Sequence, residues 1–188
     1  HEGLAEWYRT GDKTKAIMAI SESWPINSPI DDYRSKEKCL TVMAEYMKLY
    51  GTESFGVVGA PDNPMVECTF TLETGLHLSC FECGPVDGAW PGYYVVEGRD
   101  VVLKHDQIRC HNCGGALEPI EYGGIFDALV EFSGSVYVLE HKSTSQLGSY
   151  YFNQFKPNNQ VTGYTWAAGL LSGRRVGGAI INAIGVYK

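Results

Sequence analysis

The sequence lacks any apolar run of about 18 or more residues, which is the length that a membrane-spanning helix requires. It also lacks internal repeats and low-complexity tracts, so repeat and fibrous architectures are excluded. The first ten residues are polar and helix-like, and no signal peptide is expected from them. The missing initial Met and the apolar end of the chain fit a piece of a longer protein. Its 188 residues suffice for one domain with a sizeable core.

Basic residues are also few, with 15 Lys and Arg against 22 Asp and Glu, for a formal net charge of -7. This shortage argues against a broad basic face for duplex DNA or for an anionic membrane surface. It does not exclude a nuclease, because bound cations screen the acidic site of such an enzyme. Other domains or subunits would then supply part of the DNA-binding surface.

The six cysteines divide into two groups. Cys39 and Cys68 stand alone, whereas the other four form two Cys-x-x-Cys pairs, Cys80 with Cys83 and Cys110 with Cys113. Paired Cys-x-x-Cys motifs favour metal binding in a reducing compartment over the disulfides of a secreted protein. We therefore expect a cytoplasmic protein.

Apolar spacing predicts helices over residues 1–20 and 35–50, the second ending near Gly51, and strands over 53–60 and 65–74. Residues 76–119 are dense in Gly, Pro, Cys and His and have weak periodicity, so we interpret them as an insertion. After a hairpin over 123–142 and a polar loop, Pro157 is expected in the first turn of a helix that ends near Gly173. A last strand begins near Arg175. This mixture predicts an α/β domain.

The hairpin carries charged residues in the middle of two apolar strands. If Ser133 and Gly134 form a two-residue turn, paired residue numbers sum to 267 and Asp127 lies opposite Glu140. Opposed side chains have Cβ atoms about 4.5–5.5 Å apart, so two carboxylates there repel each other unless a cation lies between them. A divalent cation held by carboxylates next to Lys142 suits phosphoryl chemistry. A three-residue turn would shift the register, and the charged end of a solvated strand would show the same residues.

At these residues the sequence resembles the RecB-like branch of the PD-(D/E)XK nuclease superfamily. Asp127 matches the family aspartate, and Glu140-His141-Lys142 matches its E-x-K motif. Gln160 and Tyr164 match the Q-x-x-x-Y motif of the branch, and their spacing places them on one face of a helix. The order of the three motifs is much more specific than any one of them.

The resemblance covers residues 1–75 and 120–188 and implies a restriction-endonuclease-like α/β core, a central mixed sheet flanked by helices. It implies Mg²⁺ or Mn²⁺ as cofactor and DNA as substrate. The metal ligands would be His1, Asp127, Glu140 and the backbone carbonyl of His141. Lys142 would assist the attacking water, while Gln160 and Tyr164 would position Lys142 or the DNA.

Two further glutamates lie in predicted elements outside the hairpin. Glu67 matches a strand glutamate of the family and is either a group behind the metal ligands or an ordinary polar strand residue. Glu45 is expected on a helix surface.

The two cysteine pairs are each followed by glycine and are typical of zinc knuckles. Four thiolates from the two knuckles can surround one Zn²⁺, and glycine lets backbone amides turn toward the sulfurs. We therefore expect a zinc-ribbon-like insertion over 76–119 that stabilises a segment with little core of its own. An iron–sulfur cluster is the alternative, since some RecB-like nucleases carry one. Other residues of the segment that could serve as ligands are His77, His105 and His111.

Contacts to DNA are expected from residues near the E-x-K strand and the Q-x-x-x-Y helix. Candidate phosphate contacts are Ser143, Thr144, Lys156, Arg174 and Arg175. Tyr150, Tyr151 and Phe152 could stack on unpaired bases, although aromatic runs also form cores.

These features together predict a metal-dependent deoxyribonuclease of bacterial or phage origin, an exonuclease of DNA processing, repair or recombination. The alternative is a non-catalytic module that binds DNA ends or assembles a complex through its zinc ribbon. A zinc enzyme acting at the cysteines is weaker, because four thiolates leave no open coordination position.

Overall fold

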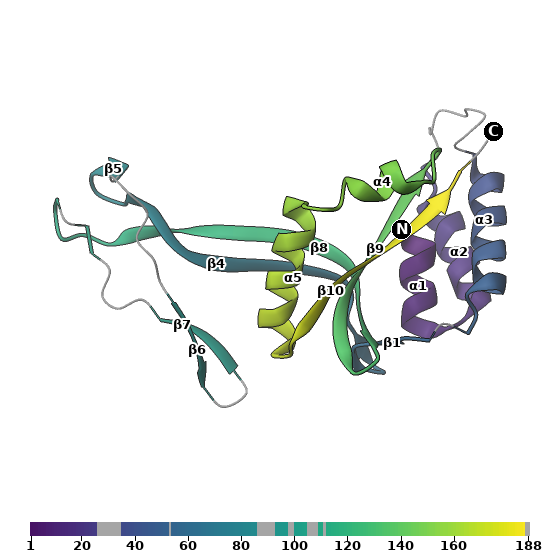
Figure 1. The fold of residues 1–188 in the computed structure, drawn as a ribbon, viewed down its shortest axis with the longest axis horizontal. Coiled ribbons are helices and arrows are strands. Elements are labelled where there is room, and N and C mark those ends of the chain that lie inside the picture. The colour runs from purple at the N-terminus through teal and green to yellow at the C-terminus, as the bar shows by residue number, and fades with distance from the viewer. Residues whose placement is uncertain are drawn as a thin grey trace. The chain divides into compact units, whose positions relative to one another are not determined.

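The computed structural model describes residues 1–25, 35–52, 54–85, 93–97, 100–104, 109–110 and 112–186. It is a mixed α/β structure whose main sheet has the strand order β10-β9-β8-β4-β5, with the short strand β1 paired to β8 (Figure 1). The chain forms two compact units. The first consists of His1–Cys68, Phe126–Ala168 and Arg175–Lys188, and the second of Thr69–Ile125 and Gly169–Arg174.

Three helices open the first unit: α1 (Glu2–Thr10), α2 (Lys13–Ser23) and α3 (Lys36–Leu49). The predicted helical structure over 1–20 is confirmed, but the chain breaks after Thr10 and forms two helices in place of one. Gly11 adopts a left-handed conformation with φ 65°, and Asp12 then caps α2 by accepting hydrogen bonds from the backbone N–H groups of Thr14 and Lys15. The predicted helix over 35–50 is confirmed by α3.

The three helices share an apolar core formed by Ala16, Ile20, Met43 and Met47, against which Leu4, Trp7 and Leu40 pack. Helices α1 and α2 approach closely at Gly3, where a Cβ atom would lie 2.5 Å from Cγ1 of Ile20. A second core cluster joins α1 to the sheet through Ala5, Ala128, Val130 and Leu139. Helix α1 is therefore fixed against the strands that carry the charged hairpin residues.

The hairpin consists of β8 (Leu117–Phe132) and β9 (Ser135–Thr144). Their register runs from Phe132↔Ser135 to Ala128↔Leu139, so the two-residue turn and the predicted sum of 267 are confirmed. Ser133 has φ 50° and Gly134 has φ 78°, as a type I′ turn requires. Strand β10 (Val176–Gly185) lies parallel to β9, with Ile181 beside Glu140 and Asn182 beside His141.

The connection between β9 and β10 contains α4 (Ser149–Asn153) and α5 (Asn159–Ser172). Part of the predicted loop is therefore helical, although α4 is only five residues long. The helix predicted between Pro157 and Gly173 is present as α5, but it begins two residues after Pro157. Gly173 directly follows its last residue and has φ 60°. The short strands β1 (Gly56–Val57), β2 (Gly59–Ala60) and β3 (Asn63–Pro64) precede β4.

The second unit contains most of β4 (Val66–Cys80), the strand β5 (Gly84–Pro85) and the antiparallel hairpin of β6 (Tyr93–Glu97) and β7 (Asp100–Lys104). Strands β4 and β8 each run from one unit into the other. The insertion over 76–119 remains a prediction. None of the helices that the structure describes is long and apolar enough to cross a membrane.

Candidate active site and metal centres

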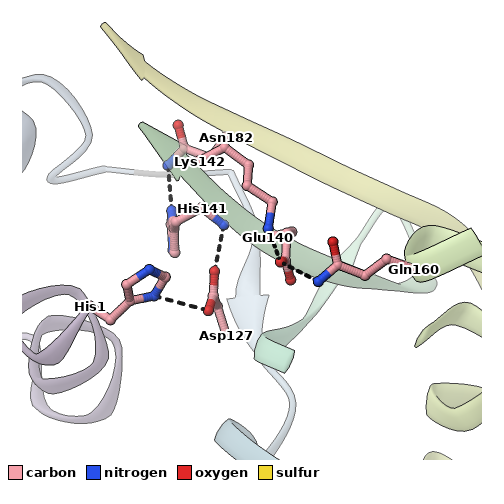
Figure 2. A network of polar contacts seen from close by, with 7 residues as sticks. All are labelled: His1, Asp127, Glu140, His141, Lys142, Gln160 and Asn182. Carbon is pink, nitrogen blue, oxygen red and sulfur yellow. Dashed lines mark hydrogen bonds and ion pairs between the residues drawn. The ribbon is translucent and has the colours of Figure 1, made fainter. Parts of the chain in front are cut away.

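The hairpin brings the predicted carboxylates into neighbouring positions on β8 and β9. Asp127 directly precedes Ala128, the last paired residue of the hairpin register, and its Oδ2 atom accepts a hydrogen bond of 2.5 Å from the backbone N–H of His141. Oε1 of Glu140 accepts hydrogen bonds from Nζ of Lys142 at 2.5 Å and from Nε2 of Gln160 at 3.2 Å. Figure 2 shows these groups together. The D, E-x-K and Q motifs therefore meet in one polar network.

The N-terminal histidine joins the same network. Nδ1 of His1 lies 3.2 Å from Oδ1 of Asp127 (Figure 2). Glu67 on β4 completes a group of three, because potential ligand atoms of His1, Glu67 and Asp127 all lie within 4.8 Å of one another. This arrangement of one imidazole and two carboxylates can hold a metal ion. The sequence left the role of Glu67 open, and only the folded chain brings it to Asp127.

Burial and hydrogen bonding act in opposite directions on these groups. Burial raises the pKa of Asp127, but hydrogen bonds from His1 and from the backbone N–H of His141 outweigh it and hold that pKa below its usual value. The hydrogen bond to Asp127 correspondingly raises the pKa of His1. Burial, followed by the charge of Asp127, raises the pKa of Glu67. Asp127 is thus the carboxylate of this group that stays ionised most readily.

Glu140 is the most buried carboxylate of the site, with a relative exposure of 6%. Its Oε2 atom is fully buried and has no hydrogen-bond partner among the described residues. Burial raises the pKa of Glu140, and the hydrogen bond from Lys142 only partly offsets this effect. Burying a carboxylate oxygen without a hydrogen-bond partner costs free energy. A proton or a cation bound to this atom would reduce that cost.

His141 forms a buried network on the other side of β9. Its ring stacks on Tyr8 with centroids 5.4 Å apart, and Nδ2 of Asn182 lies 2.9 Å from its Nδ1. The Asn182 amide also donates to the hydroxyl of Tyr46 at 2.7 Å. An amide nitrogen is a donor, so Nδ1 of His141 accepts and the neutral ring carries its proton on Nε2. Burial lowers the pKa of His141 to about 4.

The sequence did not reveal this role for the His141 side chain. Only its backbone carbonyl was predicted to act, as a metal ligand, and that remains a prediction. The signal was the middle position of the E-x-K motif, whose side chain points to the opposite face from Glu140 and Lys142.

The remaining predicted residues lie around α5 and β9. The ring of Tyr164 packs edge-on against Phe126, with centroids 5.6 Å apart. The hydroxyl of Thr144 donates a hydrogen bond to the backbone carbonyl of Gln146 and accepts one from its backbone N–H. Four of the predicted DNA contacts are exposed: Ser143, Lys156, Arg174 and Arg175. Glu45 is exposed on α3, as expected, and lies 3.6 Å from Lys48.

The second unit contains a candidate metal site of four cysteines. Sγ atoms are 3.4 Å apart for Cys80 and Cys113, 3.4 Å for Cys83 and Cys110, and 3.8 Å for Cys83 and Cys113. All four are free thiols. Zn–S bonds of about 2.3 Å in a tetrahedron place the sulfurs about 3.8 Å apart. The grouping of the four cysteines is consistent with a zinc site. The alternative histidine ligands fall outside the described side chains.

The glycine that follows each cysteine pair has a positive φ. Gly84 and Gly114 have φ 80° and 75°, a conformation that suits glycine. Backbone N–H groups of Glu82 and Gly115 point at the sulfurs of Cys80 and Cys113, each at 3.4 Å. Hydrogen bonds from the backbone N–H groups of Cys83 and Glu82 lower the pKa of Cys80 to about 7. Hydrogen bonds with the neighbouring thiols, that of Cys110 first, raise the pKa of Cys83 to about 12. Cys80 is thus the cysteine of this pair that more readily forms the thiolate, which is the form that binds a metal.

Comparisons with known proteins add no relative, since neither a protein-family model nor a curated protein sequence matches this chain.

Proposed function

We propose that the chain is a metal-dependent deoxyribonuclease with a restriction-endonuclease-like core, similar to the RecB-like PD-(D/E)XK enzymes. The observation that carries this proposal is the buried, unpartnered Oε2 atom of Glu140 beside the cluster of His1, Glu67 and Asp127. The carboxylate of Asp127 repels those of Glu67 and Glu140, and a divalent cation would remove that repulsion. Lys142, bound to the same glutamate, adds the ammonium that phosphoryl chemistry uses.

The donor set fits Mg²⁺ or Mn²⁺. Carboxylate oxygens are the ligands that both ions prefer, and an imidazole is tolerated better by Mn²⁺. The ligands would be His1, Asp127, Glu140 and the backbone carbonyl of His141, with Glu67 as a further carboxylate. The bound ion would acidify an attacking water and compensate charge on the phosphate.

The surrounding side chains then have separate tasks. Gln160 holds Oε1 of Glu140 from α5, which orients the carboxylate and leaves Oε2 for the metal. The backbone N–H of His141 holds Oδ2 of Asp127, which leaves Oδ1 on the side of His1. Lys142 would orient the water or neutralise charge that develops as the P–O bond of the phosphodiester breaks. Packing of Tyr164 against Phe126 would fix α5 beside the site.

The four cysteines are proposed to hold one structural Zn²⁺. Their sulfurs lie at the contact distances of a single tetrahedral ion, whereas an iron–sulfur cluster needs room for several metal ions between its ligands. The zinc would stabilise the second unit and leave no open position for catalysis. DNA is the proposed partner, and exonuclease action in DNA processing, repair or recombination is the proposed context.

The test is a nuclease assay with Mg²⁺ or Mn²⁺ on end-labelled linear and closed circular DNA, both single- and double-stranded. Asp127→Asn and Lys142→Gln are expected to lose cutting at least 100-fold, whereas Lys48→Gln, which changes an exposed lysine of α3, should cut normally. Sparing of circles would identify an exonuclease. If the folded, zinc-loaded protein binds DNA ends but cuts no substrate, the nuclease is refuted and the non-catalytic end-binding module takes its place.

A further inference from the structure

Charge is distributed very unevenly along this acidic chain. All 22 Asp and Glu residues lie within residues 1–140, together with ten of the 15 Lys and Arg residues, so that part has a net charge of -12. Residues 141–188 contain no acidic residue. They carry a charge of +5 from the remaining basic residues, Lys142, Lys156, Arg174, Arg175 and Lys188. The segment after Glu140 is therefore where an anionic ligand meets least repulsion.

A cavity of about 260 Å³ lies within this segment, in the first unit. Its walls are apolar except for one cation, and its lining residues are Phe152, Phe155, Lys156, Val161, Ala179 and Ile181. An aromatic and aliphatic cavity with a lysine and no carboxylate is suited to a flat apolar group attached to an anion.

The cavity adjoins the carboxylate site. Ile181 lies beside Glu140 in the parallel register of β10 and β9, so the two side chains project from the same face of the sheet on strands about 4.8 Å apart. Val161 directly follows Gln160, whose amide donates to Glu140. A ligand in the cavity would therefore be held next to the proposed scissile position.

The two phenylalanines of the cavity are both in contact with Tyr151. Tyr151 packs edge-on against both Phe152 and Phe155, each with ring centroids 5.5 Å away. Phe152 nevertheless keeps a relative exposure of 40%, and the neighbouring Tyr150 keeps 89%. A large aromatic ring that packs against a neighbour and is still partly exposed presents a stacking surface to a ligand.

We propose that this cavity binds an unpaired base of single-stranded DNA, with Lys156 on an adjoining phosphate, and that it directs the strand to Glu140. The inference rests on the proposed nuclease function and specifies its substrate as single-stranded. A base within a duplex is stacked on its neighbours and cannot enter a cavity of this kind without leaving its partner. Stacking on phenylalanine tolerates every base, so little sequence preference is expected.

The test is DNA binding, measured separately from cutting. Fluorescence anisotropy with a fluorescein-labelled oligothymidylate and a labelled blunt duplex would be recorded in the Asp127→Asn background. Phe152→Ala should weaken oligothymidylate binding about 5- to 100-fold and leave duplex binding within about twofold. Phe152→Trp, which keeps the stacking surface, should restore binding. Phe132→Ala is the matched control, because Phe132 has nearly the same exposure, 39%, at the hairpin turn.

The role of Lys156 is tested through the salt dependence of DNA binding. Lys156→Gln should weaken binding and reduce the slope of log K against log salt by about 0.7, the loss of one phosphate contact on a single strand. Lys48→Gln should leave that slope unchanged. Equal binding by Phe152→Ala and the parent, or equal losses for oligothymidylate and duplex, would overturn the base site. Binding that depends on Phe152, without any cutting by the parent chain, would uphold this site and refute the nuclease. Cutting by the parent chain, with binding that does not depend on Phe152, would uphold the nuclease and refute this site.

Discussion

The buried imidazole of His141 should make the folded state unstable to mild acid. Its relative exposure is 5%, and burial lowers its pKa to about 4 from an ordinary value of 6.5. In the unfolded chain the same ring takes up a proton as the pH falls through its ordinary value. Between those two values the unfolded state therefore binds more protons than the folded state, and stability decreases as the pH is lowered.

The size of the effect follows from the difference between the two pKa values. A pKa lowered from 6.5 to about 4 corresponds to about 3 kcal/mol when the whole range is crossed. Linkage places about 2 kcal/mol of this between pH 7 and pH 5, which for a chain of this size lowers Tm by about 4–8 °C. The raised pKa of His1 acts in the opposite direction, because its contribution is complete below pH 6.5 and is lost as the pH rises.

The measurement is urea unfolding at pH 7 and pH 5 for the parent chain without Mg²⁺ or Mn²⁺, for His141→Gln and for His1→Gln. When the pH is lowered from 7 to 5, the free energy of unfolding should fall by about 2 kcal/mol more for the parent than for His141→Gln, because glutamine does not titrate. For His1→Gln the free energy of unfolding should fall slightly more than for the parent, because the stabilising effect of protonated His1 is absent. NMR titration of the His141 ring provides a check that needs no variant. A ring that titrates near pH 6.5 in the folded protein would refute the reasoning, as would equal losses for the parent and His141→Gln.

Three further outcomes follow from the fold. Leu139→Ala, at a fully buried site in the sheet, should lower the free energy of unfolding by about 2–5 kcal/mol, whereas Leu49→Ala, at a side chain 71% exposed, should change it by less than about 0.5 kcal/mol in urea unfolding. Ser133→Asn should raise Tm slightly, because Asn-Gly suits the positive φ values of this turn better than Ser-Gly; a lower Tm would contradict the turn type. Cys110→Ser should abolish the binding of one Zn²⁺ per chain in a metal assay and speed hydrogen exchange at the backbone N–H groups of Phe81 and Gly114; unchanged zinc content would exclude the four-cysteine site.

Local patterns were sufficient to predict the hairpin and its register. The alternation of side chains in β8 and β9 and the Ser-Gly turn are properties of neighbouring residues, so Asp127 could be placed next to Glu140 without any knowledge of the rest of the chain. The cysteine group was predictable for a similar reason, because each knuckle is a local motif with its own glycine. In both cases the positions of the side chains relative to one another follow from local spacing.

Long-range packing explains what the sequence did not reveal. Tyr46 and Asn182 are 136 residues apart, and their hydrogen bond beside His141 exists only because α3 and β10 pack on the same part of the structure. The split between α1 and α2 was missed for a different reason. The apolar spacing continues across Gly11, and the local turn chemistry of Gly11-Asp12 overrides it.

The backbone conformation of Glu67 is a further argument that the group of His1, Glu67 and Asp127 is a functional site. Its backbone has φ 51°, a left-handed conformation that is unusual for a glutamate, and its carboxylate lies in the group formed with His1 and Asp127. The conformation costs about 1–3 kcal/mol, and burial next to a second carboxylate adds to that cost. The charges of His1 and Arg9 offset the burial of Glu67 only in part, because its pKa stays above the usual value. A divalent cation would offset both at once, because it needs the carboxylate at this position and neutralises its neighbour. Strained residues concentrate at functional sites for this reason, and the strain at Glu67 lies within the same cluster as the proposed metal ligands.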